Sequence, residues 1–411
     1  MKPHVLIATT SQWFPAARLG MALAAAGCTV EAICPSRHSL FKTSIVHKSY
    51  TYHGLSPLTS FADAVAAAKP KLIVPCDDLT VLHLHELYNR ERSRGEAGAV
   101  ICEPIVRSLG APASFPIVCA RTAFMALARE EDIRVPNTAV IANLSELRSW
   151  VARMGFPVVL KADGTSGGDG VRIARTLDEA ERAFRTLQAP PLWARAIKRA
   201  LIDRDMRLVW PSVLRQRSVV SAQAFVAGRE ATTTVACWEG DVLASLHFEV
   251  LSKQDSTGPS TVLRVIENTE MLTTAEKMVR RLGLSGMYGF DFMLEASSGN
   301  AHLVEINPRA TQVGHLALGP GRDLPAALYA AISGSVIRES PKVTENDTIT
   351  LFPHEWLRNP ASPFLRSSYH DVPWEEPDFV RYCVGTSRKQ KDLYSQEKWF
   401  RSLSPARLPR Q

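Results

Sequence analysis

The stretch Gly289–Arg309, which reads GFDFMLEASSGNAHLVEINPR, constrains the fold of this chain more than any other. Its apolar segments Gly289–Leu294 and Ala301–Ile306 each have the length of a short strand. The loop between them, Glu295–Asn300, is rich in turn-forming residues. The pattern therefore predicts a β-hairpin.

Three oxygen-bearing side chains lie on this hairpin. Glu305 and Asn307 are two residues apart, so they project from the same face of a strand, and strand pairing can bring Asp291 beside them. Carboxylate and amide oxygens are ligands that Mg²⁺ accepts while it also shares phosphate oxygens. The hairpin by itself predicts either a metal site, for Mg²⁺ or Mn²⁺, or only a polar, solvated strand end.

A glycine-rich loop follows Lys161, which ends an apolar strand. Glycine has no Cβ to block an approaching phosphate, and the adjacent lysine adds a positive charge. The loop predicts either a phosphate-binding segment or a flexible turn. Its glycines and its serine are Gly164, Ser166, Gly167, Gly168 and Gly170.

Three other motifs are disfavoured. The loop lacks the lysine and the helix that would follow the glycines of a Walker A motif. Gly164–Gly168 fits the GxSxG pattern of serine hydrolases, but Val171–Ala174 reads as a returning strand where that motif needs a helix. The loop after the first strand, Thr10–Pro15, has no glycine, which excludes a GxGxxG dinucleotide site.

Strands alternate with helices over roughly the first 110 residues, which predicts an open α/β domain with a parallel sheet. Asp77 and Asp78 follow one of these strands, where they either contact a ligand or begin a helix. Farther along, Ser218–Val226 and Thr232–Trp238 predict neighbouring strands of an antiparallel meander.

Composition bounds the remaining possibilities. A chain of 411 residues that is 45% hydrophobic predicts a soluble, globular protein of two or three domains. No apolar stretch is long enough to cross a bilayer, and the seven cysteines form no CxxC pair, which favours the cytoplasm. Much of the net charge of +7 comes from the segment that runs from Arg388 to the end, which has seven basic and two acidic residues. The balanced remainder argues against nucleic-acid binding.

Two regions carry no motif that points to chemistry. The basic, apolar segment Pro190–Leu214 predicts an amphipathic surface helix, with Trp193, Ile197 and Leu201 on the packed face. Contact with a membrane or a phosphorylated substrate is the alternative. Beyond residue 335, the aromatic-rich segments around Trp356 and Trp374 are predicted to pack within the fold. The alternatives are that they cover the mouth of the active site or form an oligomer surface.

Taken in their order along the chain, the motifs resemble those of the ATP-grasp superfamily, carboxylate–amine ligase type. This superfamily includes D-alanine–D-alanine ligase and biotin carboxylase. The resemblance covers about residues 1–335 and implies a mixed α/β and α+β fold. It implies an N-terminal open α/β domain over residues 1–115 and a linker helix with a lid subdomain over 116–225. An antiparallel subdomain with the metal site would span 226–335, and a C-terminal extension with a basic tail 336–411.

The resemblance also assigns roles to individual residues. Asp291, Glu305 and Asn307 match the Mg²⁺ ligands, and Arg309 matches an arginine that steadies the acyl phosphate or substrate carboxylate. Lys161 and the loop glycines match the phosphate-binding lysine and the mobile loop. The other positions implied to contact ATP are Arg121, Gln223, Ala224, Val226, Glu230 and Lys253. Two of these depart from the family pattern, because Arg121 stands where lysine is usual and Gln223 where glutamate is usual.

The activity implied is ADP-forming ligation, in which ATP activates a small-molecule carboxylate as an acyl phosphate and an amine or a similar nucleophile captures it. Positioning and charge neutralisation would carry catalysis, with Lys161 and Arg309 nearest the reaction. A homodimer is compatible with the sequence. The alternatives are a phosphotransferase on the same scaffold and a nucleotide-binding protein without turnover, which the intact set Asp291, Glu305 and Asn307 disfavours.

Overall fold

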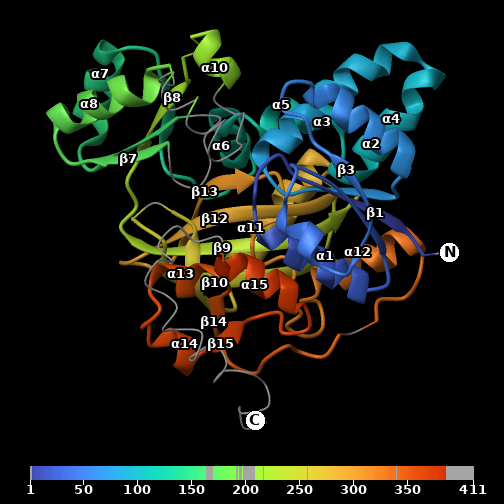
Figure 1. Ribbon diagram of the computed structural model, residues 1–411. Coiled ribbons are helices and arrows are strands. Elements are labelled where there is room, and N and C mark those ends of the chain that lie inside the picture. The colour runs from blue at the N-terminus through green and yellow to red at the C-terminus, as the bar shows by residue number, and fades with distance from the viewer. Residues whose placement is uncertain are drawn as a thin grey trace.

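The structure is a computed structural model that describes residues 2–162, 170–190, 193, 197, 209–215, 217–256, 258–338 and 340–385. Three sheets organise the chain: a small parallel sheet, a small antiparallel sheet and a larger, mostly antiparallel sheet (Figure 1). Across the described residues, no helix combines the length and the apolar character needed to cross a membrane.

The N-terminal unit is built on four parallel strands in the order β3-β2-β1-β4, which confirms the predicted parallel sheet. Alternate residues of β1 face opposite sides: Leu6 packs toward α2, α3 and α4, and Ile7 toward α1. Both faces of the sheet are therefore covered, as a parallel sheet requires. The elements are β1 (His4–Ala8), α1 (Pro15–Ala25), β2 (Thr29–Cys34), η1 (Ser39–Lys42), β3 (Val46–Thr51), α2 (Pro57–Ala68), β4 (Leu72–Pro75), α3 (Asp78–Glu91), η2 (Arg92–Arg94) and α4 (Glu96–Leu109).

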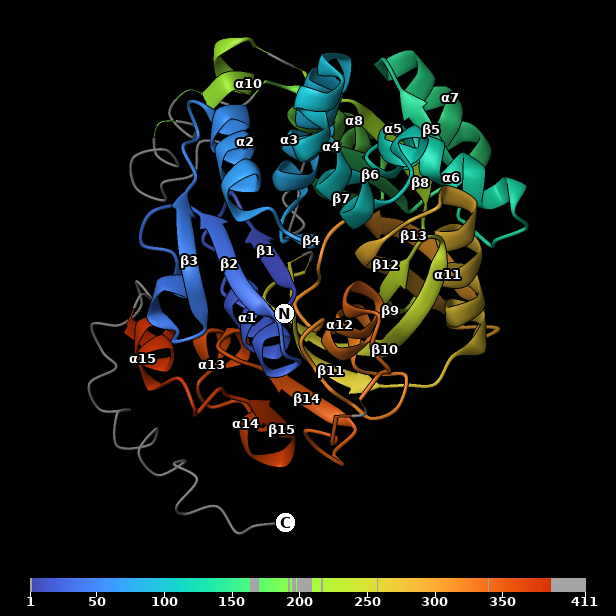
Figure 2. The ribbon, with the colours of Figure 1, turned by 90° about the vertical axis from the view of Figure 1, so that its right-hand side faces the viewer.

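A short helical linker leads from this unit to an antiparallel lid with the strand order β5-β8-β6-β7 (Figure 2). Helices α7 and α8 bury Trp150 and Phe184 against the lid sheet. The linker contains η3 (Pro112–Ser114), α5 (Phe115–Val118) and α6 (Arg121–Glu130). The lid contains β5 (Thr138–Ile141), α7 (Leu144–Met154), β6 (Val158–Ala162), β7 (Val171–Ala174), α8 (Leu177–Gln188), α10 (Val209–Val213) and β8 (Val220–Ala224).

The predicted pairing of β8 with the strand that follows it is wrong. Strand β8 lies between β5 and β6 in the lid, whereas β9 (Gly228–Trp238) belongs to the large sheet. The reason is that Val220 and Ala222 pack into the apolar core of the lid, so the chain crosses between sheets after Ala224. Glycine is required at the start of β9, because a Cβ at Gly228 would lie 2.0 Å from the carbonyl oxygen of Leu294.

The large sheet has seven strands in the order β13-β12-β9-β10-β11-β14-β15. Helices α6 and α11 cover one part of it through Phe124 and Met278, and α12 packs through Leu328 into a second core that also includes residues of α1 and β1. Its elements are β9, β10 (Asp241–Lys253), β11 (Ser260–Val265), α11 (Thr269–Leu282), β12 (Gly286–Glu295), β13 (Ala301–Asn307), α12 (Leu324–Ser333), β14 (Thr348–Leu351) and β15 (Tyr369–Asp371).

The last described residues complete this sheet and contact the N-terminal unit. Trp356 is buried, so packing is the role the structure gives it. Glu376 accepts hydrogen bonds from the backbone and side chain of Ser44, and Tyr382 donates to the carbonyl of Arg37. The remaining elements are α13 (His354–Arg358), α14 (Phe364–Ser367) and α15 (Pro377–Gly385).

Two predicted features lie mostly outside the described residues. Of the segment predicted as an amphipathic helix, Trp193 and Ile197 are described and are 54% and 52% exposed, so neither shows the predicted burial, while Leu201 is not described. The basic tail from Arg388 onward is also outside the described part.

Candidate active site

The predicted hairpin is formed by β12 and β13, and it brings its polar side chains together. Asp291 and Glu305 are direct cross-strand partners. Asn307 lies at the end of β13, and its Nδ2 donates a hydrogen bond to Asp291 Oδ2 at 2.9 Å. The three side chains predicted as metal ligands are therefore neighbours in the structure.

A β-bulge in β13 sets their direction. Asp291 pairs with Glu305, and the next residue, Phe292, pairs with Leu303, so Val304 is the extra residue. The bulge lets Leu303 and Ile306 both enter the core while Glu305 between them keeps a partly exposed carboxylate. The backbone carbonyl freed at Val304 accepts a hydrogen bond from Lys161 Nζ at 3.4 Å.

Two cations contact the Glu305 carboxylate, whose side chain is 30% exposed. Arg121 Nη2 donates to Glu305 Oε1 at 2.9 Å, and Lys161 Nζ lies 3.7 Å from Oε2. Arg121 is the first residue of α6, and Lys161 is near the end of β6 in the lid. The structure thus places the two predicted phosphate-contacting cations beside a predicted metal ligand.

The two carboxyl groups of the hairpin differ in pKa. Desolvation, and then the negative charge of Glu305, raise the pKa of Asp291 above its usual value. Desolvation also acts on Glu305, but the charges of Arg121 and Lys161 outweigh it and hold its pKa below the usual value. Desolvation lowers the pKa of Lys161, and attraction to Glu305 offsets only part of that effect. The two carboxyl groups are therefore not equivalent: Glu305 has cations beside it, whereas Asp291 is desolvated and lies next to a like charge.

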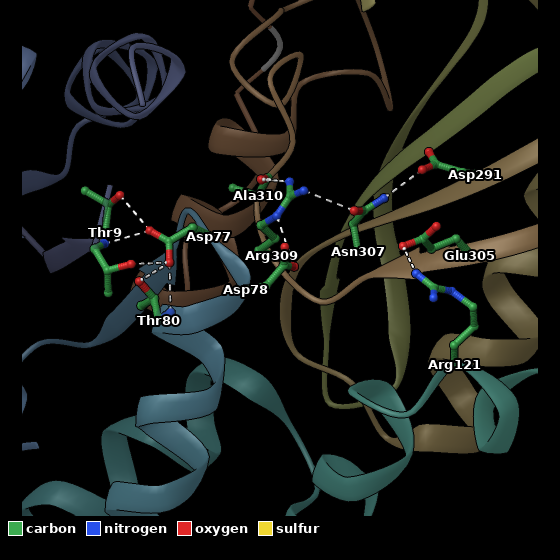
Figure 3. Close-up of polar contacts among 11 residues, drawn as sticks. Thr9, Asp77, Asp78, Thr80, Arg121, Asp291, Glu305, Asn307, Arg309 and Ala310 are labelled. Carbon is green, nitrogen blue, oxygen red and sulfur yellow. Dashed lines mark hydrogen bonds and ion pairs between the residues drawn. The ribbon is translucent and has the colours of Figure 1, made fainter. Parts of the chain in front are cut away.

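Arg309 extends this polar cluster toward the N-terminal unit (Figure 3). Its Nη2 donates to Asn307 Oδ1 at 3.1 Å, and its Nε donates to Asp78 Oδ1 at 3.2 Å. The hydrogen bonds thus run without a break from Asp291 through Asn307 and Arg309 to the first residue of α3. The contact between Arg309 and Asp78 was not predicted.

Asp77 fixes the position of that helix. Its carboxylate caps α3 by accepting from the backbone N–H of Thr80 at 2.9 Å, and it also accepts from Thr9 Oγ1 and from the N–H of Thr10. The sequence left open whether Asp77 and Asp78 begin a helix or contact a ligand. Asp77 is the helix cap, and Asp78 faces the cluster around Arg309 (Figure 3).

The residues predicted to hold adenosine lie at the crossing from the lid to the large sheet. Gln223 is buried and donates from Nε2 to Thr138 Oγ1 at 3.2 Å, which leaves its amide oxygen able to accept. The backbone N–H of Ala224 donates a hydrogen bond to the carbonyl of Asn137, whereas no described residue hydrogen bonds to the backbone of Val226. Glu230 pairs with Lys253, with 2.5 Å between Oε1 and Nζ.

The glycine-rich loop is described only at its ends. Lys161 of β6 pairs with Val171 of β7, and Ala162 donates to the carbonyl of Gly170 at 2.9 Å. The loop is therefore followed by the predicted returning strand, and not by the helix that a serine-hydrolase turn requires. Gly164, Ser166, Gly167 and Gly168 lie outside the described residues.

Comparison with known proteins agrees with this geometry. The family model for the ATP-binding domain of the carbamoyl-phosphate synthase L chain matches residues 120–318. This span includes the described residues of the candidate site other than Asp78, Asp77 and the threonines that contact Asp77. Over this span, just under half of its length, the chain is similar to that ATP-binding domain. The arginine-specific large chain of carbamoyl phosphate synthase from Geobacillus stearothermophilus is 27% identical over 270 residues, which are 65% of this chain and 24% of that one.

Solved structures show the same ATP-grasp fold. N5-carboxyaminoimidazole synthase from Aspergillus clavatus, in complex with ADP and 5-aminoimidazole ribonucleotide, has a TM-score of 0.59 at 14% identity, with 82% of this chain and 78% of that one covered. The biotin carboxylase domain of 2-oxoglutarate carboxylase from Hydrogenobacter thermophilus, in complex with MgADP, has a TM-score of 0.57 at 15% identity, with 82% and 71% covered. By contrast, the chain spans only about a quarter of the first curated relative it matches.

The side chains of the ATP-grasp hairpin fit a magnesium ion. Asp291, Glu305 and Asn307 supply hard oxygen ligands from adjacent strand positions. No cluster of three or more His, Cys, Asp or Glu side chains suited to a metal occurs among the described residues, so two carboxylates and an amide are the set available here. A divalent cation would also favour the ionised form of Asp291, whose pKa is raised by desolvation and then by the charge of Glu305.

Proposed function

We propose that this protein is an ATP-dependent, ADP-forming ligase that joins a small-molecule carboxylate to an amine through an acyl phosphate. The observation that carries the proposal is the polar cluster itself. Asp291, Glu305 and Asn307 are flanked by Lys161 and Arg121 on one side and by Arg309 on the other.

In this proposal each part of the cluster contributes charge or position. Mg²⁺, held by Asp291, Glu305 and Asn307, would neutralise phosphate charge. Lys161 and Arg121 leave Glu305 for the phosphate oxygens when nucleotide binds, since a phosphate offers a stronger partner. Arg309, held by Asp78, Asn307 and the carbonyl of Ala310, offers the remaining N–H groups of its two Nη atoms to the carboxylate or the acyl phosphate.

The reaction that follows is balanced in two steps. An oxygen of the substrate carboxylate attacks the γ-phosphorus, and ADP departs with the electron pair of the broken P–O bond. The amine nitrogen then attacks the acyl carbon, phosphate leaves with the C–O electron pair, and the amine proton is released. Alignment and charge neutralisation suffice for both steps, so no protein nucleophile is needed.

The test is a phosphate-release screen in which carboxylic acids are combined with amines in the presence of ATP and Mg²⁺. Release should require one acid and one amine together, and Glu305→Ala should abolish it. Arg264→Ala is a matched control, because Arg264 lies exposed on β11 of the same sheet, away from the cluster. The control should release phosphate at the wild-type rate.

Three outcomes would contradict the proposal. Equal release by wild type and Glu305→Ala would show that the cluster is not the catalytic site. A stable phosphorylated acid formed without any amine would indicate a phosphotransferase. Nucleotide binding without release under every combination would indicate a binding protein.

The partners follow from the same proposal. Its substrates are small molecules, and we place the protein in the cytoplasm, where ATP and Mg²⁺ are supplied. The biotin carboxylase domain similar to this chain is described as a dimer. A homodimer is therefore proposed here too, and sedimentation equilibrium of the purified protein would measure it.

A further inference from the structure

A pocket opens beside Glu305, between the N-terminal unit and the linker helices. It has a volume of about 80 Å³. One wall is α3, a second is formed by α5 and α6, and the floor is the end of β13. Its lining residues are Asp78, Leu82, Val118, Cys119, Arg121, Phe124, Met125, Glu305, Ile306 and Pro308.

The pocket is apolar along one side. Leu82 lies one helical turn after Asp78, so both project from the same face of α3. Leu82 is 41% exposed, although the opposite face of its helix is buried. Across from it, the Cys119 thiol contacts His85, and burial raises the pKa of that thiol to about 12, so it is neutral. An apolar group entering the pocket would cover Leu82 and gain the free energy of that burial.

The other end of the pocket is charged. Arg121 and Glu305 are paired there, at the predicted metal site. Asp78 uses Oδ1 for Arg309, while no described side chain donates a hydrogen bond to Oδ2. The Oδ2 atom can therefore accept from an ammonium or amine group next to the polar cluster.

From these observations we infer that the pocket binds the amine substrate, and that this substrate carries a short aliphatic group. The inference rests on the proposed function. The aliphatic group lies between Leu82 and Cys119, and the amine lies at Asp78, beside the group it would attack. Size sets the limit, because an apolar cavity that holds a benzene ring is about 150 Å³. The pocket, at about 80 Å³, is smaller than that cavity, so a branched aliphatic group fits it better than an aromatic ring.

Binding of three simple probes tests the inference without turnover. Dissociation constants for isobutylamine, benzylamine and isobutanol are measured by saturation-transfer NMR, with and without MgADP. Isobutylamine should bind at least about tenfold more tightly than benzylamine, which is the effect of poor fit in an apolar pocket. It should also bind more tightly than isobutanol, its neutral analogue. Equal binding of all three would overturn the inference.

Substitutions on α3 locate the site. Leu82→Trp should weaken isobutylamine at least about tenfold by filling the pocket, whereas Leu82→Ala should admit benzylamine. Glu86→Trp is the matched control, because Glu86 is exposed one turn farther along the same helix and does not line the pocket. If Leu82→Trp and Glu86→Trp behave alike, the pocket is not the amine site.

Asp78→Asn should remove the preference for isobutylamine over isobutanol while the limit on size remains. Binding of ADP, measured in parallel by calorimetry, separates this inference from the proposed function. A protein that binds MgADP and releases phosphate but shows no selectivity among the probes refutes the inference alone. A protein that selects isobutylamine but never binds ADP refutes the proposed function.

Discussion

The carboxylate of Asp371 and the pair Asp291–Glu305 both lie beside arginine side chains, yet their surroundings differ. Asp371, on β15, accepts hydrogen bonds from Arg18 of α1 and from His315 Nε2, the latter at 2.6 Å. Its side chain is 2% exposed. Despite desolvation, the charges of Arg18 and His315 hold its pKa far below the usual value. Both oxygens of this carboxylate are occupied by side chains of the protein.

The pair Asp291–Glu305 on the hairpin has different surroundings. Glu305 is partly exposed, and the pKa of Asp291 is raised by desolvation and by its neighbour Glu305. Arg121 and Lys161 contact the carboxylate of Glu305, and neither forms an ion pair with Asp291. The comparison teaches that both oxygens of Asp371 are paired within the protein and join three parts of the fold. Asp291, by contrast, forms no ion pair among the described residues and lies beside a second carboxylate, an arrangement that an external cation can neutralise.

The largest effect is expected at Asp371. Asp371→Asn should lower the free energy of unfolding by about 3–5 kcal/mol, because it leaves the charge of Arg18 buried without its partner. Urea unfolding at pH 7 measures this. Glu375→Gln is the control, since Glu375 is exposed and 3.8 Å from Arg18, and it should change stability little. If the two variants are equally stable, the two carboxylate clusters do not differ as described.

At the hairpin, the effect should fall on activity and spare the fold. Asp291→Asn should reduce phosphate release about 10²- to 10³-fold, the usual cost of removing one preorganised electrostatic group. Its stability should equal or exceed that of wild type, because a carboxyl with a raised pKa destabilises the folded state when ionised. Urea unfolding and phosphate release are measured on the same preparation. A large loss of stability would show that Asp291 is a structural residue.

The pH dependence should differ in sign between the two sites. The folded-state pKa of Asp371 is depressed, so its contribution is present above the usual pKa of 3.8 and is lost as the pH falls toward the folded value. The pKa of Asp291 is raised, so its ionisation destabilises the fold at neutral pH, and this cost disappears as the pH falls through that pKa. Urea unfolding of each variant against wild type at pH 7 and pH 4 should show the stability advantage of Asp291→Asn shrinking at pH 4. The stability deficit of Asp371→Asn should persist at pH 4 and shrink only at lower pH.

The smallest effect is expected at Lys253, whose ion pair with Glu230 is partly exposed. Lys253→Ala should leave stability nearly unchanged and raise the KM for ATP at most about fivefold, since an exposed pair contributes about 0–1 kcal/mol. Steady-state kinetics at saturating acid and amine measures this. A loss of activity as large as that of Asp291→Asn would place Lys253 with the central cluster.

Much of the fold was predictable because its signals are local. The alternation of apolar segments predicted the N-terminal parallel sheet, although β3 was missed, since its residues on the sheet edge are mostly exposed and polar. The hairpin was predicted with nearly its observed bounds. Strand β8 was assigned to the wrong neighbour, because a glycine between two strand-like segments resembles a hairpin turn whether or not the strands share a sheet.

The candidate site also has features that the sequence predicted and features that it did not. The grouping of Asp291, Glu305 and Asn307 followed from strand periodicity and was confirmed as geometry, while their roles as metal ligands stay a prediction. The bulge at Val304 leaves no signal in a single sequence, because only the register with β12 reveals it. The contact of Asp78 with Arg309 joins residues 231 positions apart, which no local pattern encodes.

The sequence by itself determined which segments become strands and helices, and which side chains share a face, since these depend on periodicities of a few residues. Only the tertiary structure decided that β8 belongs to the lid, that Asp78 holds Arg309 and that Asp371 joins Arg18 to His315. The physical reason is that such partners are selected when distant apolar faces pack together. Packing brings distant charges into contact only after those faces have found each other.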